Sequence, residues 1–291
     1  MRTLIIGGSN SVDLARSVAR RAKTSFCALS VERFPDKETL IRIPADVTGR
    51  HAVIVNATLP DPNCALMEMT LAIDAARRAG AKRVTIIAPY LSYMRQDKVF
   101  EPGQAISAQV MAHVLENADT VIAVDPHLHR IHRLRDIFQT KAASITANPL
   151  LADFISRRYP DAVVLGPDGE SYQWAQAIAR RIGHDSTVLE KTRYGAKKVS
   201  VRTRGNVSLN GRDVVIVDDM ISTGHTVAEA AKLAKRLGAR HVSCVCVHGL
   251  FLGDAVAVMR KAGVRDITST NTVHTRYSKI DIAPLIADAL R

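Results

Sequence analysis

Aromatic residues are scarce in this chain: phenylalanine, tyrosine and tryptophan together make up 4% of its 291 residues. Proteins that bind single-stranded nucleic acid stack the bases on such side chains. The chain is nevertheless basic, with 40 Lys and Arg against 28 Asp and Glu, a net charge of +12. The basic residues are scattered as short pairs, such as Arg20-Arg21 and Arg77-Arg78, and form no long block. We therefore expect no nucleic-acid partner, most basic pairs on solvated helix faces, and anionic small substrates that account for the surplus.

Cysteines and long apolar runs are also few. The four cysteines form no CxxC pair and no disulfide framework, and Cys244 and Cys246 alternate as buried small side chains do in a strand. No apolar run approaches membrane-spanning length. The segment Met1–Gly8 has the pattern of a strand and a turn and is too short for a signal peptide. We expect a cytoplasmic protein that does not associate with membranes.

Three common motifs are missing from the sequence. It contains no G-x-x-x-x-G-K-[ST] loop, no G-x-G-x-x-G after a strand and no G-x-S-x-G elbow. If the chain binds a nucleotide, it must do so with another architecture.

Short apolar runs alternate with amphipathic stretches along the whole chain. The predicted strands are 3–6, 52–55, 83–88, 120–124, 162–165, 214–217, 241–247 and 266–268, and the predicted helices are 12–22, 65–79, 105–116, 149–159, 172–182, 227–237 and 253–262. Such alternation predicts an α/β fold with mostly parallel sheets flanked by helices.

The chain also repeats itself. The segments 79–85 and 237–243 are similar in sequence, and each follows a predicted helix and opens a predicted strand. The repeat predicts two tandem domains of the same kind, residues 1–146 and residues 147–291.

Residues 214–226 form the most informative stretch of the chain. Four β-branched residues, Val214–Val217, predict a buried strand that ends at two carboxylates, Asp218 and Asp219. A tight polar turn at 222–226 then leads into a helix. Backbone N–H groups and the dipole at a helix N-terminus favour an anion, whereas paired carboxylates suit sugar hydroxyls or a magnesium shell. The stretch therefore predicts a site for a phosphorylated sugar, and a capped strand–turn–helix without a ligand is the structural alternative.

Other polar clusters follow predicted strands, where open α/β sheets bind their ligands. Residues 95–98 carry Arg, Gln, Asp and Lys, which suit an anion or a nucleotide. His127 follows the strand 120–124 and Asp168 follows the strand 162–165, so both could hold a divalent cation that a polyphosphate completes.

Two further segments give weaker signals. Lys191 and Arg193 stand at alternate positions after a strand-like run and could close over a transferring phosphoryl group, although a solvated charged hairpin is the default interpretation. The polar loop 33–39 alone indicates only a surface turn.

Taken together and in this order, these segments resemble the ribose-phosphate pyrophosphokinase (PRPP synthetase) family. The matching segments are 33–38, 89–98, 102–103 with 106–107, 124–127, 167–168, 191–193, 218–226, 248–251, 270–272 and 280–286. The resemblance covers nearly the whole chain and implies two tandem phosphoribosyltransferase-like domains. It also implies the reaction: transfer of the β,γ-diphosphoryl group of ATP to the 1-hydroxyl of ribose 5-phosphate, giving PRPP and AMP.

The resemblance further assigns roles to residues of this chain. It implies a shared ATP site in a homo-oligomer, to which a neighbouring subunit contributes, and Mg²⁺ as the cofactor. The implied residues are Asp36, Lys37, Glu38, Arg95 and Gln96 for ATP; His127 and Asp168 for the metal; Lys191 and Arg193 for catalysis; and Arg193, Asp218, Asp219, Ser222, Thr223, Gly224, His225 and Thr226 for ribose 5-phosphate.

Three positions depart from the pattern that is usual in the family. His225 replaces a glycine in the phosphate loop, Pro126 replaces a leucine before His127, and Glu170 stands where small residues are common. Because His225 has a side chain where glycine has none, it affects how closely the backbone of the loop can approach a phosphate. Its imidazole could also donate a hydrogen bond.

Three other functions remain open from the sequence. A non-catalytic regulatory relative should have lost the loop cations or the metal histidine, and this chain keeps Lys191, Arg193, His127 and Asp168. A phosphoribosyltransferase that consumes PRPP would explain residues 214–226 but not residues 95–97 or the repeat. A nucleic-acid-binding module would rest on charge alone and predicts steep salt dependence.

Overall fold

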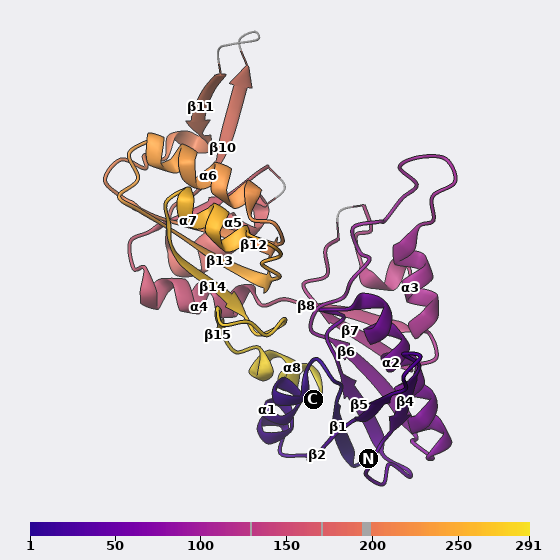
Figure 1. Cartoon of the computed structure of the whole chain (residues 1–291). Coiled ribbons are helices and arrows are strands. Elements are labelled where there is room, and N and C mark those ends of the chain that lie inside the picture. The colour runs from indigo at the N-terminus through magenta and orange to yellow at the C-terminus, as the bar shows by residue number, and fades with distance from the viewer. Residues whose placement is uncertain (129, 170, 194–198) are drawn as a thin grey trace. The chain divides into compact units, whose positions relative to one another are not determined.

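The computed structural model describes residues 1–128, 130–169, 171–193 and 199–291; of residues 190–193, 199–202 and 206 it describes the backbone alone. The chain forms two compact units (Figure 1). The first comprises residues 1–146, 272–274 and 282–291, and the second comprises residues 147–271 and 275–281. The chain therefore crosses to the second unit after residue 146, and its last helix returns to the first.

The first unit contains a six-stranded parallel sheet with the order β2-β1-β5-β6-β7-β8. Its strands are β1 (Thr3–Gly7), β2 (Ser25–Ala28), β5 (His51–Val55), β6 (Arg83–Ala88), β7 (Thr120–Val124) and β8 (Lys141–Ile145). An antiparallel hairpin, β3 (Ser30–Arg33) and β4 (Thr39–Arg42), stands apart from this sheet. The helices are α1 (Val12–Ala22), α2 (Pro62–Arg78), α3 (Ser107–Leu115) and α8 (Ala283–Ala289), with a 3₁₀ turn at Leu134–Asp136.

The second unit contains a seven-stranded sheet with the order β11-β10-β9-β12-β13-β14-β15, in which only the β10–β11 pair is antiparallel. Its strands are β9 (Val163–Gly166), β10 (Ser186–Arg193), β11 (Val199–Thr203), β12 (Asp213–Ile221), β13 (His241–Gly249), β14 (Val264–Thr270) and β15 (Ser278–Ile280). The helices are α4 (Asn148–Arg158), α5 (Tyr172–Ile182), α6 (His225–Arg236) and α7 (Ala255–Lys261), with a 3₁₀ turn at Arg204–Asn206.

The two units have the same topology. In each, the first parallel strand lies between the second and the third, and the later strands follow in chain order. The helix α8 packs on α1 in the first unit, as α4 packs on the corresponding helix α5 in the second. This confirms the prediction of two tandem α/β domains with mostly parallel sheets, and it shows that the chain's last helix completes the first of them.

Each unit has its own hydrophobic core. The central strands β1, β5, β6 and β7 and the inner faces of α2 and α3 supply the first core, and β9, β12, β13 and α6 supply most of the second. Their β-branched and aliphatic runs are buried on both faces of the sheets, as in parallel sheets generally. These continuous runs are the strands that the sequence predicted.

The sequence did not predict β2, β3, β4, β8, β11, β15 or α8. The strands β2 and β8 are edge strands whose residues are partly exposed, so their patterns contain no continuous apolar run. The strands β3 and β4 pair only with each other, and α8 has seven residues. These elements depend on pairing or packing with distant segments, which local periodicity does not reveal.

Four of the basic pairs lie in the last turns of helices. Arg20-Arg21 ends α1, Arg77-Arg78 ends α2, Arg157-Arg158 ends α4 and Arg180-Arg181 ends α5. Cations are favourable at this end of the helix dipole. The side chains of these pairs are exposed, in agreement with the prediction that most basic pairs lie on solvated helix faces.

Within the described part of the chain, the helices lack the combination of length and apolar character that crossing a membrane requires.

Candidate active site

The candidate site lies at the carboxyl edge of the second unit's sheet. The strand β9 has β10 on one side and β12 on the other, so the chain order reverses between β9 and β12. Loops that leave strands on either side of such a reversal diverge and open a crevice for a ligand. Asp168 follows β9, and the two carboxylates of 214–226 lie at the end of β12.

The strand β12 extends further than the sequence predicted. It includes Asp218 and Asp219 and ends at Ile221, because it stays in parallel register with the equally long β13 up to Gly249. Consecutive residues of a strand point to opposite faces. The Asp219 amide donates a hydrogen bond to Oδ1 of Asp218 at 3.1 Å, which holds the Asp218 carboxylate against the backbone of Asp219.

The loop after β12 leads directly into α6, which begins at His225 with Gly224 as its N-cap. Gly224 is left-handed, with φ +74°, and an ideal Cβ there would lie 2.9 Å from the carbonyl oxygen of Ala255. Only glycine satisfies both constraints. Thr223, His225 and Thr226 are exposed, so the N–H groups of the first turn of α6, which have no intrahelical acceptors, lie beside accessible side chains.

A second loop fixes the position of the first. After β13, the amides of Leu250 and Phe251 donate to the carbonyl oxygen of Ile221 at 3.0 and 3.1 Å, and the amide of Leu252 donates to that of Ser222 at 3.0 Å. The Phe251 ring packs edge-to-face on Tyr277 at 5.2 Å. No role for Phe251 or Tyr277 emerged from the sequence, because their contact joins segments far apart and follows no local spacing.

Asp168 organises the turn between β9 and α5. The Ser171 amide and hydroxyl donate to Oδ1 of Asp168 at 2.9 Å each, and the amide of Asp168 donates to the Ser171 hydroxyl oxygen at 3.0 Å. The Asp168 side chain remains exposed. The turn therefore presents a carboxylate held in one orientation next to Asp218.

The pKa of Asp218 is raised well above its ordinary value. Desolvation is the largest cause, followed by the negative charges of Asp219 and Asp168. Carboxylates that repel each other in a partly desolvated place are stabilised by a cation or by hydroxyl donors. The carboxylates at the end of β12 therefore suit sugar hydroxyls or a hard cation such as Mg²⁺.

Among the residues that the structure describes, no three or more His, Cys, Asp or Glu side chains gather as a ready-made metal cage. A magnesium ion usually keeps waters and takes phosphate oxygens beside one or two protein carboxylates, which agrees with this sparse set. His127, partly exposed after β7, belongs to the first unit, whereas Asp168 belongs to the second, and each unit is described by itself.

Lys191 and Arg193 lie on β10, in the part of the strand that pairs with β11 alone. Lys191 is opposite Val201 and Arg193 is opposite Val199, whereas β10 pairs with β9 only from Ser186 to Val188. The hairpin thus extends beyond the sheet (Figure 1). The side chains of Lys191 and Arg193 lie outside the described part of the structure, so their predicted role is untested.

Arg95 and Gln96 lie in the first unit, in the segment after β6. Gln96 lines a pocket of about 350 Å³ together with Lys98, Phe100 and Ser107, and the Ser107 hydroxyl donates to Oε1 of Gln96. Arg95 is exposed. The pocket places amide, hydroxyl and ammonium groups side by side, a combination that suits a polar ligand.

The loop after β7 is joined to this segment by an ion pair. Nη1 of Arg130 lies 3.0 Å from Oδ1 of Asp97, and the Arg130 amide donates to Oδ2 at 3.2 Å. Desolvation of Asp97 opposes these bonds, but the bonds prevail and lower the pKa of Asp97. The Asp97–Arg130 pair thus holds the segment that carries Arg95 and Gln96 against the segment that follows His127.

Asp36, Lys37 and Glu38 form the tip of the β3–β4 hairpin. The Phe34 amide donates to the Glu38 carbonyl oxygen at 2.9 Å, and the Glu38 amide donates to Oδ1 of Asp36 at 3.1 Å. All three side chains of this tip, which are among the five predicted to contact ATP, are exposed. The tip is a defined turn that presents its charges to solvent.

Comparison with known proteins identifies the family. Residues 3–119 match the N-terminal domain of ribose phosphate pyrophosphokinase, and residues 134–277 match the phosphoribosyl transferase domain. The chain belongs to the ribose-phosphate pyrophosphokinase family. Its resemblance to this family, its two-domain fold and its being an enzyme of this family, all predicted from the sequence, are thereby confirmed.

Several members of the pyrophosphokinase family resemble the chain over its full length. The ribose-phosphate pyrophosphokinases of Methanopyrus kandleri and Methanothermobacter thermautotrophicus are 33% and 35% identical, with 99% of this chain and 98% and 100% of theirs covered. The crystal structure of phosphoribosylpyrophosphate synthetase from Mycobacterium smegmatis superimposes with a TM-score of 0.87 at 29% identity, covering 100% of this chain and 98% of that one. A transferase built from the second unit alone would not share this full-length similarity.

In this chain, the first unit has a different arrangement at the place that corresponds to the phosphate loop of the second. There α2 begins with the Asp61 carboxylate accepting from the Cys64 amide at 3.1 Å. The nearby Glu68 is 1% exposed and accepts from the Ser9 amide, the Ser9 hydroxyl and the Asn56 side chain at 2.8, 2.6 and 3.0 Å. In the first unit these carboxylates take up the backbone and side-chain donors that a phosphate would need, and their negative charge repels a phosphate. The corresponding loop of the second unit therefore suits a phosphate, whereas the loop of the first unit does not.

Proposed function

We propose that this chain transfers the β,γ-diphosphoryl group of ATP to the 1-hydroxyl of ribose 5-phosphate, and that residues 218–226 form the acceptor site. The observation that carries the proposal is the end of β12: two carboxylates in a partly desolvated place, followed at once by a helix N-terminus. The carboxylates can accept hydrogen bonds from the hydroxyls of a phosphorylated sugar, and the N–H groups of the helix N-terminus can donate to its phosphate.

The loop Ser222–Thr226 would bind the 5-phosphate, and Asp218 and Asp219 would accept hydrogen bonds from the ribose hydroxyls. Gly224 lets the loop pass close to α7, and the bonds from Leu250, Phe251 and Leu252 hold it in that position before a ligand arrives. Preorganisation of this kind reduces the free energy spent on ordering the loop. His225 would add a side-chain donor beside the phosphate.

Lys191 and Arg193 would act on the transferring group. Lys191 and Arg193 stand at alternate positions of the sequence, a spacing that suits two cations acting on one group. In the reaction the 1-hydroxyl oxygen attacks the β-phosphorus in line while the bond from that phosphorus to the α-phosphate oxygen breaks, and AMP leaves. Cations placed where charge builds up in such a transfer stabilise its transition state.

The donor ATP would bind with help from Arg95 and Gln96, and Asp36, Lys37 and Glu38 would complete the site from a neighbouring subunit. The exposed tip of the β3–β4 hairpin supports the second part, because it presents three charged side chains to an approaching copy. A homo-oligomer is therefore part of the proposal. A cytoplasmic location stays a prediction from the sequence.

Asp168 in the second unit and His127 in the first would each serve magnesium binding, together with phosphate oxygens of the substrate. The exposed carboxylate of Asp168, fixed by Ser171, suits a hard cation with a preference for oxygen. When bound, the ion would neutralise the polyphosphate. The protein side chains would meanwhile orient the sugar hydroxyl and hold the loop.

The proposal is tested by incubating the purified protein with ATP, ribose 5-phosphate and magnesium, and following AMP and PRPP by chromatography. We expect both products in equal amounts. Formation of ADP instead of AMP, or no product over a range of phosphate and metal concentrations, would contradict the proposed reaction. Omission of ribose 5-phosphate is the control, because AMP released without it would indicate hydrolysis.

A further inference from the structure

A hollow of about 820 Å³ lies at the opposite, amino-terminal edge of the first unit's sheet, where β1 and β2 begin and α1 and α8 end. Its charged side chains are Arg2, Arg21, Lys23 and Arg291. All of the residues that line it are described, and none of them is an aspartate or a glutamate. The hydroxyl-bearing residues Thr3, Thr24 and Ser25 complete its polar lining.

Two of these cations have no recorded partner within the described structure. The exposed side chains of Arg2 and Lys23 take part in no hydrogen bond or ion pair with residues of the described ranges. Arg291 lies 3.3 Å from Oδ1 of Asp288 at an exposed position, where such a pair contributes little. The hollow therefore holds two cations, Arg2 and Lys23, that the side chains of the described residues do not compensate.

Lys23 occupies a position that normally belongs to glycine. It is the C-cap of α1 with a left-handed backbone, φ +52°, and its amide donates to the carbonyl oxygens of Ala19 and Arg20. Glycine is favoured at this place because it has no Cβ. The corresponding cap of α5 in the second unit is Gly183, with φ +69°. A lysine in a strained position, facing a hollow that already holds arginines, indicates a use for its ammonium group.

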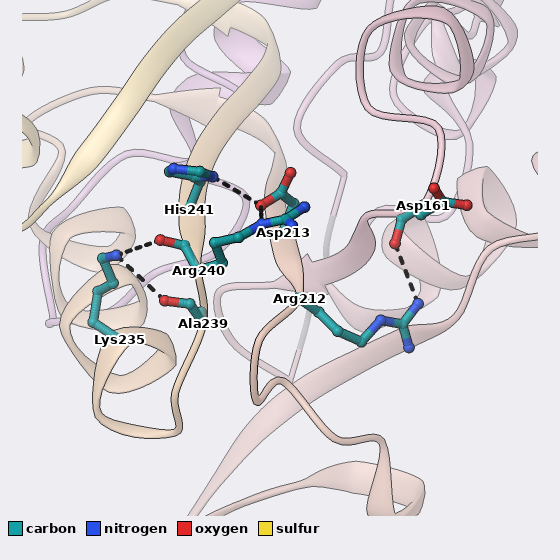
Figure 2. A network of polar contacts seen from close by, with 7 residues as sticks. All are labelled: Asp161, Arg212, Asp213, Lys235, Ala239, Arg240 and His241. Atoms are coloured by element: carbon teal, nitrogen blue, oxygen red, sulfur yellow. Dashed lines mark hydrogen bonds and ion pairs between the residues drawn. The ribbon is translucent and has the colours of Figure 1, made fainter.

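At the amino-terminal edge of the second unit's sheet, by contrast, the basic side chains have hydrogen-bond or ion-pair partners (Figure 2). Oδ1 of Asp213 accepts from Nε of Arg240 at 2.9 Å and lies 3.0 Å from Nδ1 of His241. Arg212 pairs with Asp185 at 2.5 Å and donates to the Asp161 carbonyl oxygen at 3.2 Å, and Lys235 donates to the carbonyl oxygen of Arg240 at 2.7 Å. There each of these cations has a carboxylate or a carbonyl oxygen as its partner.

We propose that the hollow of the first unit binds a small anion with two or more phosphate groups, and that it recognises the phosphates alone. Guanidinium and ammonium groups beside hydroxyls suit phosphate oxygens, and the volume lies within the range of small-molecule sites. The described lining contains no aromatic side chain on which a base could stack. This site is separate from the sugar-phosphate loop at the carboxyl edge of the second unit.

The test is isothermal titration of the full-length protein with inorganic pyrophosphate at low salt. Lys23→Gly removes the ammonium and suits the left-handed backbone, and Arg2→Gln removes the guanidinium at an exposed position, so both variants should fold. We expect two classes of pyrophosphate site in the wild type, one of which is weakened roughly tenfold or more in the double variant, since bonds to charged groups are lost. Arg20→Gln is the matched control, because Arg20 ends the same helix, bonds Ser17 and does not line the hollow.

Two results would overturn the proposal: unchanged pyrophosphate binding in the double variant, or an equal loss in Arg20→Gln. ADP should lose affinity in parallel with pyrophosphate, and a loss for ADP alone would contradict recognition of the phosphates only. If the variants weaken binding of a single-stranded oligonucleotide while pyrophosphate does not bind, the surface serves nucleic acid and the proposal is wrong. If residues 222–226 bind no phosphate, the wild type would show a single class of pyrophosphate site, the one that the double variant weakens. Failure of the proposed sugar-phosphate loop is therefore distinguishable from failure of the proposed hollow.

Discussion

Gly224 and Ala255 are so close that an ideal Cβ on Gly224 would lie 2.9 Å from the Ala255 carbonyl oxygen, and 3.0 Å from Cγ of Met259. The phosphate loop is thus pressed against α7 at the residue that caps α6. Because the neighbouring atom belongs to the backbone, a side chain at position 224 cannot be accommodated by a rotamer change alone.

We therefore predict that Gly224→Ala destabilises the protein and weakens ribose 5-phosphate binding. The left-handed backbone and the overpacking against α7 together should lower the free energy of unfolding by roughly 2–4 kcal/mol. Urea unfolding measures this directly. Gly211→Ala is the matched control, since Gly211 has a similar φ of +71° and nothing within 4 Å of an added Cβ; equal losses in the two variants would contradict the packing argument.

Asp218→Asn should stabilise the free protein at neutral pH while weakening its binding of ribose 5-phosphate. The pKa of Asp218 is raised in the folded state by desolvation and by Asp219 and Asp168. The folded protein then binds a proton more tightly than the unfolded chain, so stability falls as the pH rises from the ordinary carboxyl pKa through the raised one. Thermal unfolding measured from acid to neutral pH should show this fall in the wild type and lose it in Asp218→Asn.

Asp213→Asn should change the pH dependence of stability in the opposite direction. Hydrogen bonds from Arg240 and His241 outweigh desolvation and lower the pKa of Asp213, so its contribution is present above the ordinary carboxyl pKa and is lost as the pH falls through the lowered one. This variant should be less stable than the wild type at neutral pH. The same pH dependence for both variants would show that the assigned causes are wrong.

Lys191→Ala and Arg193→Ala should each lower kcat by about 10²–10³, by analogy with loss of a preorganised donor to a developing charge, and leave ATP binding nearly unchanged. Steady-state kinetics and nucleotide titration together separate the two effects. Thr192→Ala is the control, because Thr192 lies between the two cations in the sequence and carries no charge. A wild-type kcat in Lys191→Ala would exclude the catalytic role.

Arg130→Ala should raise the KM for ATP and reduce stability by about 1–3 kcal/mol, because it leaves the Asp97 carboxylate without its charged partner. The side chain of Asp97 is only 3% exposed, so water replaces the lost bonds poorly. Asp97→Asn in the Arg130→Ala background should restore part of the stability, since the amide carries no charge to desolvate. No change in the KM for ATP would show that the Asp97–Arg130 pair does not position Arg95 and Gln96.

The strand–loop–helix of residues 214–226 was predictable because each of its signals is local. β-Branched residues favour a buried strand, small polar residues favour a turn, and an amphipathic run favours a helix. The same reasoning placed Asp168 and residues 95–98 after strands. It stopped β12 at Val217, because the extension to Ile221 exists only through pairing with β13.

The sequence by itself therefore determined the alternation of strands and helices, the two-domain repeat, and which polar residues follow which strands. Tertiary structure alone decided that the last helix returns to the first unit, that Asp168 and Asp219 raise the pKa of Asp218, and that Gly224 lies against Ala255. It also decided that the cations around Arg240 have partners, whereas the side chains of Arg2 and Lys23 have none among the residues that the structure describes. The physical reason is that propensity and periodicity act between near neighbours, whereas desolvation, charge coupling and close packing arise between residues that only folding brings together.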